Sequence, residues 1–179
     1  ARMVTALQTV ASRAIDPLHP VVVTVTQFHG GDTYNVIPEK VVLRGTVRTL
    51  DTGVQQQAEA AIRRIVEGVA ASAGVTAEVD YMTGYPPTVN DEAESEFAAA
   101  IAVGIVDADN VVRNANPKMG AEDFSFMLNE RPGCYIWIGN GPGESGCHLH
   151  NPNYDFNDQV LPLGASYWAR LAETRLARR

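Results

Sequence analysis

The sequence is poor in cysteine, in long apolar runs and in basic residues. Its only cysteines, Cys134 and Cys147, are too few for a disulfide-stapled fold and fit a chain that folds in a reducing cytoplasm. No apolar run approaches the ~20 residues that a membrane-spanning helix needs. With 14 Lys and Arg against 21 Asp and Glu, the net charge is -7 and the pI near 5.0. This balance argues against nucleic acid or an anionic membrane as a partner.

The sequence also lacks several common catalytic motifs. No GxSxG nucleophile turn, Walker loop or GxGxxG turn follows a segment with strand character. What remains is a chain with 45% hydrophobic residues, which is typical of a globular protein. Its 179 residues allow one domain or two small ones.

The first part of the chain predicts the order helix, strand, strand, helix, strand. Apolar spacing indicates helices over 4–15 and 54–69, and β-branched runs indicate strands within 19–31 and 36–50, joined as an antiparallel hairpin by GGDTYN. Alternation predicts a third strand over 75–82. This is an α+β arrangement, a ferredoxin-like βαββαβ unit without its first strand. No capping residue precedes the first helix, so we expect the chain to be part of a longer polypeptide.

The segment GYPPTVND interrupts all regular structure and divides the chain into predicted regions 1–83 and 84–179. The second region alternates helix and strand, as in part of an α/β layer. A helix is predicted over 93–105, with Asn90 as a candidate N-cap, and a shorter one over 123–128.

Two more elements are predicted near the C-terminus. The apolar run CYIWIG, residues 134–139, is typical of a strand buried on both faces. The closing helix has Asp158 at its N-cap and Pro162 in its first turn. Its predicted apolar stripe consists of Leu161, Ala165, Trp168, Leu171 and Ala172.

The stretch LHNPNYDFND holds the strongest candidate metal ligand, His150. A neutral imidazole is a common ligand for zinc or manganese, and Asp155 and Asp158 are candidates to hold its other nitrogen or its loop. From spacing alone, the favoured alternative is a loop histidine that only hydrogen-bonds to backbone. The cluster Cys147, His148 and His150 matches no well-formed zinc pattern.

Two further groups of residues suit an acylated amino acid as ligand. Asn35 follows the first predicted strand, and an amide donor can polarise a carbonyl oxygen. Arg48 ends the second strand, and a guanidinium can clamp a carboxylate. In MGAEDFS, Gly120 allows a backbone to approach a ligand closely. The acids that follow Gly120 have an ordinary explanation at the start of a helix.

Taken together, GGDTYNVIPE, RGTVRTL, YPPTVND, MGAEDFS and LHNPNYDFND, in this order and at these separations, resemble the M20 family of metal-dependent amidohydrolases. The resemblance is to its hippurate hydrolase and N-acyl-amino-acid amidohydrolase branch, and it covers nearly the whole chain. It implies that residues 1–83 are most of a lid domain, which lacks its first strand here and through which two subunits pair as a homodimer. It also implies that 84–179 is the C-terminal part of an α/β catalytic domain.

The resemblance implies roles for individual residues. His150 matches the family's last metal ligand, for zinc, manganese, nickel or cobalt. Asn35 matches a catalytic lid residue that reaches the partner subunit's active site, and Arg48 matches a substrate-binding lid residue. The substrate would be an N-acyl amino acid or a small peptide. The implied loop beside the substrate consists of Gly120, Ala121, Glu122 and Asp123.

The family's other metal ligands and its Glu-Glu pair have no counterpart in this sequence. Because a catalytic zinc site wants about three protein ligands, we expect the chain alone to be inactive. An alternative is a stand-alone dimerisation or binding module without catalysis.

Overall fold

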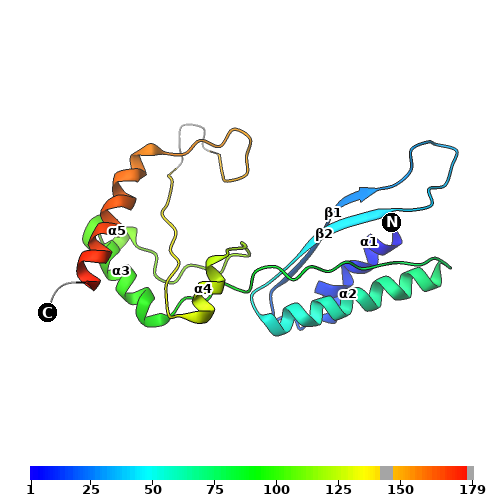
Figure 1. Ribbon diagram of the computed structural model, residues 1–179, viewed down its shortest axis with the longest axis horizontal. Coiled ribbons are helices and arrows are strands. Elements are labelled where there is room, and N and C mark those ends of the chain that lie inside the picture. The colour runs from blue at the N-terminus through cyan, green and yellow to red at the C-terminus, as the bar shows by residue number, and fades with distance from the viewer. Residues whose placement is uncertain (142–146, 177–179) are drawn as a thin grey trace. The chain divides into compact units, whose positions relative to one another are not determined.

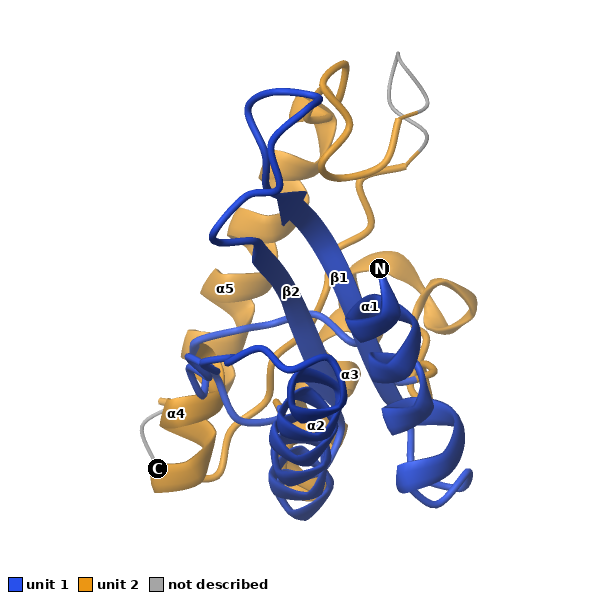
Figure 2. Cartoon of the chain, turned by 90° about the vertical axis from the view of Figure 1, so that its right-hand side faces the viewer, with its two compact units in different colours: residues 1–87, 117–123 blue, residues 88–116, 124–179 orange. Residues whose placement is uncertain are grey.

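The computed structural model describes residues 1–141 and 147–176, which fall into two compact units. Unit 1 comprises residues 1–87 and 117–123, and unit 2 comprises 88–116 and 124–179 (Figure 2). Both helices and strands are present, as the sequence predicts.

Unit 1 is built on an antiparallel hairpin, β1 (Val21–His29) and β2 (Val42–Thr49), which confirms the predicted pairing. The strands are shorter than predicted, because residues 30–41 form a loop that includes the VIPEK segment. The register pairs His29 with Val42 at the loop end and Val21 with Thr49 at the other end.

Gly45 allows the two strands to approach closely at a bulge between Val25 and Gln27. A Cβ at Gly45 would lie 2.2 Å from the carbonyl oxygen of Thr24, so any side chain there would push the strands apart.

Helices α1 (Arg2–Leu7) and α2 (Thr52–Ser72) pack together with the hairpin (Figure 1). A π-helical turn over Val10–Ala14 continues α1 before Pro17. The Asp51 carboxylate caps α2 by accepting from the Val54 amide at 2.9 Å. Their shared core is a cluster of Leu7, Val10, Ile15, Val54, Ala58, Ala61, Ile62 and Val66.

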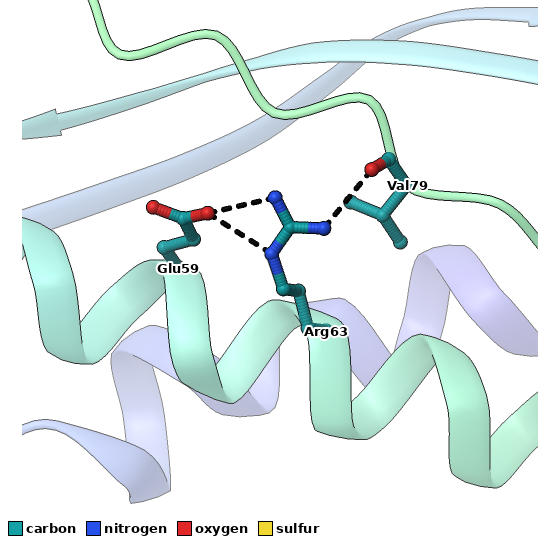
Figure 3. Close-up of polar contacts among 3 residues, drawn as sticks. All are labelled: Glu59, Arg63 and Val79. Carbon is teal, nitrogen blue, oxygen red and sulfur yellow. Dashed lines mark hydrogen bonds and ion pairs between the residues drawn. The ribbon is translucent and has the colours of Figure 1, made fainter.

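The prediction of a third strand over residues 75–82 is wrong. Within the described residues, no ladder joins it to β1 or β2, although Val79 and Tyr81 still pack on the core. Instead, Arg63 of α2 donates to the Val79 carbonyl at 3.0 Å while Glu59 accepts from Arg63 (Figure 3). A strand needs a neighbour to complete its ladder. In a full βαββαβ unit the first strand would lie between the hairpin and the last strand.

Unit 2 contains α3 (Glu92–Val106), α4 (Phe124–Glu130) and α5 (Leu161–Arg175), with 3₁₀ turns at Ala108–Asn110 and Asp158–Val160. These three helices confirm the predicted ones with small shifts at their ends.

Helices α3 and α5 pack against each other. The buried Tyr167 hydroxyl donates to the Ala98 carbonyl at 3.4 Å. Arg175 lies 4.4 Å over the Phe97 ring and pairs with Glu94. The predicted stripe of α5 is shifted, because Trp168 is 65% exposed while its neighbour Tyr167 is only 5% exposed.

Both predicted caps in unit 2 need correction. Asp91, and not Asn90, caps α3 by accepting from the Glu94 amide at 3.0 Å. Asn157, and not Asp158, caps the turn before α5 by accepting from the Gln159 amide at 3.1 Å.

The apolar run 134–139 is extended but is not a strand among the described residues. The Asn90 side chain takes the place of a strand neighbour there: its Nδ2 donates to the Tyr135 carbonyl at 2.9 Å, and its Oδ1 accepts from the Tyr135 amide at 2.8 Å. An extended segment therefore satisfies part of its backbone through one side chain.

Candidate substrate-binding site

Arg48 and the segment 117–123 meet in unit 1. The Nη1 of Arg48 donates to the Met119 carbonyl oxygen at 2.9 Å, although 71 positions separate the two residues in sequence. The register pairs Arg48 with Val22, whose position in β1 faces away from the core valines. The contact therefore fixes segment 117–123 to the hairpin of unit 1.

The residues around this contact are accessible to a ligand. Met119 is half-buried and Glu122 is half-buried, whereas Gly120 and Ala121 are exposed. A Cβ at Gly120 would have no atom within 4 Å. The structure thus places Arg48 beside the loop that contains Gly120, Ala121 and Glu122.

Asn35 lies in the loop between β1 and β2, at the opposite end of the hairpin from Arg48. Its Oδ1 accepts from the Thr33 hydroxyl at 2.8 Å, which leaves its Nδ2 as the atom able to donate. From Val42 to Arg48 the strand runs about 20 Å, at roughly 3.3 Å per residue. The hairpin thus separates Arg48 from the end of the loop that holds Asn35.

His150 lies in a tight turn of unit 2 and is exposed. Its φ of 69° is in the left-handed region, which a residue with a Cβ seldom adopts, and such strain is often found where a side chain is aimed for function. The turn is closed by the Asn151 amide, which donates to the His148 carbonyl at 3.2 Å.

The predicted support of His150 by carboxylates is wrong in the part of the chain that the structure describes, since neither Asp155 nor Asp158 bonds to the imidazole. The loop is held instead by an asparagine pair. The Asn157 amide donates to the Asn140 Oδ1 at 2.9 Å, and the Asn157 Nδ2 donates to the Asn140 carbonyl at 3.2 Å.

The described residues contain no grouped set of potential metal ligands. Across 1–141 and 147–176, no three His, Cys, Asp or Glu side chains are grouped as a ligand set. Cys147, His148 and His150 therefore do not form a site, and His150 supplies at most one donor. No helix within the same residues has the length and apolar character to cross a membrane.

The sequence pattern of peptidase family M20/M25/M40 matches residues 3–174. The chain belongs to this family. It is 32% identical to the hippurate hydrolase of Campylobacter jejuni over 170 residues, which cover 95% of this chain and 44% of that protein. It is 35% identical to thermostable carboxypeptidase 1 of Saccharolobus solfataricus, over 93% of this chain and 42% of that protein.

A solved M20 structure has the same fold over this length. The YXEP protein of Bacillus subtilis, a dinuclear metal binding peptidase, superposes with a TM-score of 0.72 at 27% identity. The match covers 99% of this chain and 45% of that one. The chain thus spans less than half the length of the M20 proteins it matches.

Sequence reasoning missed Met119, which acts through its main-chain carbonyl. A carbonyl is common to every residue, so no side-chain pattern marks it. The only available signal was its position before Gly120, in a loop already predicted to lie beside a ligand.

Proposed function

We propose that this chain supplies substrate-holding residues of a metal-dependent amidohydrolase that cleaves the amide bond of N-acyl amino acids or small peptides. The contact between Arg48 and Met119 carries the proposal, because it gathers the guanidinium and the exposed Gly120 at one place. In this assignment residues 1–83 are most of the lid and residues 84–179 belong to the catalytic domain.

Each residue has a chemical task in this proposal. Arg48 keeps N–H donors beyond the one bonded to Met119, and these would bind the substrate's carboxylate. Ala121 and Glu122 would line the same pocket. The Asn35 Nδ2 would donate to the carbonyl oxygen of the scissile amide, where negative charge develops during hydrolysis.

The position of Asn35 supports a homodimer in which the lid of each subunit places Asn35 in the active site of the other subunit. Since Asn35 and Arg48 lie at opposite ends of one hairpin, a substrate that contacts both would need two copies of the chain. Pairing through the lid would supply the second copy.

His150 would be one ligand of the divalent metal, which would be zinc, manganese, nickel or cobalt. Its exposure and its constrained turn suit a ligand presented from a loop. When bound, the metal would activate water for attack on the amide. Because no group of three potential ligands lies within the described residues, we assign to this chain the binding and orientation of substrate.

The DNA upstream of the Ala1 codon tests the proposal directly. We expect an in-frame extension that carries further histidine and acidic metal-binding motifs. A stop codon followed at once by a start for this chain would contradict an amidohydrolase and favour a stand-alone pairing module. This test requires only DNA sequencing, and its outcome does not depend on how the chain folds.

A further inference from the structure

Asn140 and Gly141 form the only Asn–Gly pair in the sequence. In such a pair the main-chain nitrogen of the glycine can attack the side-chain amide carbon of the asparagine, because glycine has no Cβ to hinder the approach. Gly141 is exposed and has a φ of 67°. Among the described atoms, a Cβ at Gly141 would meet only the Asn157 Nδ2, at 3.7 Å. The space beside Asn140 is therefore open enough for this attack.

Asn140 also holds the end of the loop that contains His150. Its Oδ1 accepts from the Asn157 main-chain amide at 2.9 Å, and its carbonyl oxygen accepts from the Asn157 Nδ2 at 3.2 Å. Its own Nδ2 donates to the Asp155 carbonyl at 3.4 Å. A chemical change at Asn140 therefore acts on a contact with Asn157, 17 positions further along the chain.

The reaction at this pair is deamidation, and water is its only co-reactant. The Gly141 nitrogen bonds to Cγ of Asn140, the Cγ–Nδ2 bond breaks, and Nδ2 leaves as ammonia with the proton that the Gly141 nitrogen gives up. Water then opens the resulting five-membered imide at one of its two carbonyl carbons. Opening at Cγ gives aspartate. Opening at the main-chain carbonyl carbon gives isoaspartate, in which the chain continues through the former side chain.

The two products have different effects on the loop. In aspartate the main chain keeps its path, and Oδ1 remains an acceptor for the Asn157 amide. In isoaspartate the Gly141 nitrogen is bonded to Cγ, so it stands where Nδ2 stood, beside the Asp155 carbonyl. The chain then leaves residue 140 in a different direction. This displaces the start of the loop from its end at Asn157 and breaks the hydrogen bonds between them.

We propose that Asn140 is a deamidation site, and that its isoaspartate form releases Asn157 whereas its aspartate form does not. The asparagine pair holds the loop only until this reaction occurs. The segment that is released contains His150, the exposed histidine of the strained turn. The proposal does not rest on a role for His150 in metal binding.

Mass spectrometry of the folded 179-residue chain, kept at mildly alkaline pH, tests the site. We expect a mass gain equal to the difference between an amide and an acid, and fragment ions should place this gain at residue 140. Labelling by an isoaspartyl methyltransferase should identify isoaspartate among the products. Asn151 is an internal control in the same loop: it precedes Pro152, whose nitrogen carries no hydrogen, so it cannot form the imide and should keep its mass.

Hydrogen exchange of the Asn157 main-chain amide, followed by nuclear magnetic resonance, separates the two products. In the isoaspartate form, isolated by chromatography, this amide should exchange about tenfold faster than in the parent chain, the effect of losing one hydrogen bond. Asn140→Asp is the matched control. Its Asn157 amide should exchange no faster than in the parent chain, because the carboxylate still accepts from it.

Three outcomes would overturn the proposed site. The first is a residue 140 that keeps its mass through prolonged incubation. The second is an isoaspartate form in which the Asn157 amide exchanges as slowly as in the parent chain. The third is an Asn140→Asp chain in which it exchanges as fast as in the isoaspartate form. None of these measurements involves a substrate, a metal or the upstream coding sequence, so the proposed function is judged separately.

Discussion

At the scale of single residues, burial changes the acidity of two tyrosines. Burial raises the pKa of Tyr167, with a smaller contribution from Cys134. Burial also raises the pKa of Tyr81; Glu59 adds to the rise and Arg63 opposes it. Both hydroxyls therefore stay protonated at a pH where an exposed tyrosine ionises.

These shifts predict how stability depends on alkaline pH. An unfolded tyrosine ionises near pH 10, below the folded pKa of Tyr81 and Tyr167. Above pH 10 the folded state therefore holds more protons, and stability falls as pH rises toward the folded values. Below pH 10 the two groups should cause no change.

Absorbance titration near 295 nm, together with urea unfolding at several pH values, measures both effects. Tyr81 and Tyr167 should ionise late. Tyr167→Phe and Tyr81→Phe should each remove one late step. Late steps that persist in both variants would contradict the assignment.

At the scale of elements, two extended segments are held by side chains in place of strand ladders. Arg63 binds the carbonyl of Val79 in segment 75–82, and Asn90 binds both polar groups of Tyr135 in segment 134–139. Both segments have the apolar pattern of strands. In segment 75–82 the pattern arises because Val79 and Tyr81 pack on the core. Burial sets the pattern, and hydrogen-bond partners decide whether a strand forms.

Arg63→Ala should release segment 75–82 from α2. This substitution removes the hydrogen bond to the Val79 carbonyl and the ion pair with Glu59. In that pair the Arg63 side chain is 42% exposed and the Glu59 side chain is 30% exposed. Because solvent screens an ion pair this exposed, we expect the free energy of unfolding to fall by only about 1 kcal/mol. Hydrogen exchange should quicken over 75–82, and urea unfolding should give the loss in stability.

Arg64→Ala is the control for this change, because Arg64 is the exposed neighbour on the same helix. It should leave both exchange and stability nearly unchanged. Equal effects of the two substitutions would mean that helix propensity, and not the Val79 contact, holds the segment.

At the scale of the whole molecule, the proposed substrate-binding residues are not accompanied by a grouped set of metal ligands within the described residues. No three potential ligands are grouped within the described residues, and catalytic zinc needs about three from the protein. We therefore expect no hydrolysis of N-benzoylglycine by the 179-residue chain with added manganese, zinc or nickel. Measurable turnover that follows the protein through purification would contradict this expectation.

Much of the fold follows from local sequence signals. Apolar periodicity predicted α2, α3 and α5, and β-branched runs predicted the β1–β2 hairpin. The ordered motifs were enough to indicate the M20 family, which the match over residues 3–174 confirms. Helix ends were less predictable: Asn90 and Asp91 are adjacent and both suit an N-cap, and only the backbone geometry selects Asp91.

The sequence by itself determined the helices, the hairpin and the family, because each depends on residues close together or on motifs in a fixed order. Tertiary structure alone decided that Arg48 meets Met119, 71 positions away, and that two strand-like segments join no β-ladder within the described residues. The physical reason is that a backbone carbonyl or amide carries no sequence signal. Its partner is chosen by whichever donor or acceptor the folded chain brings within hydrogen-bond distance.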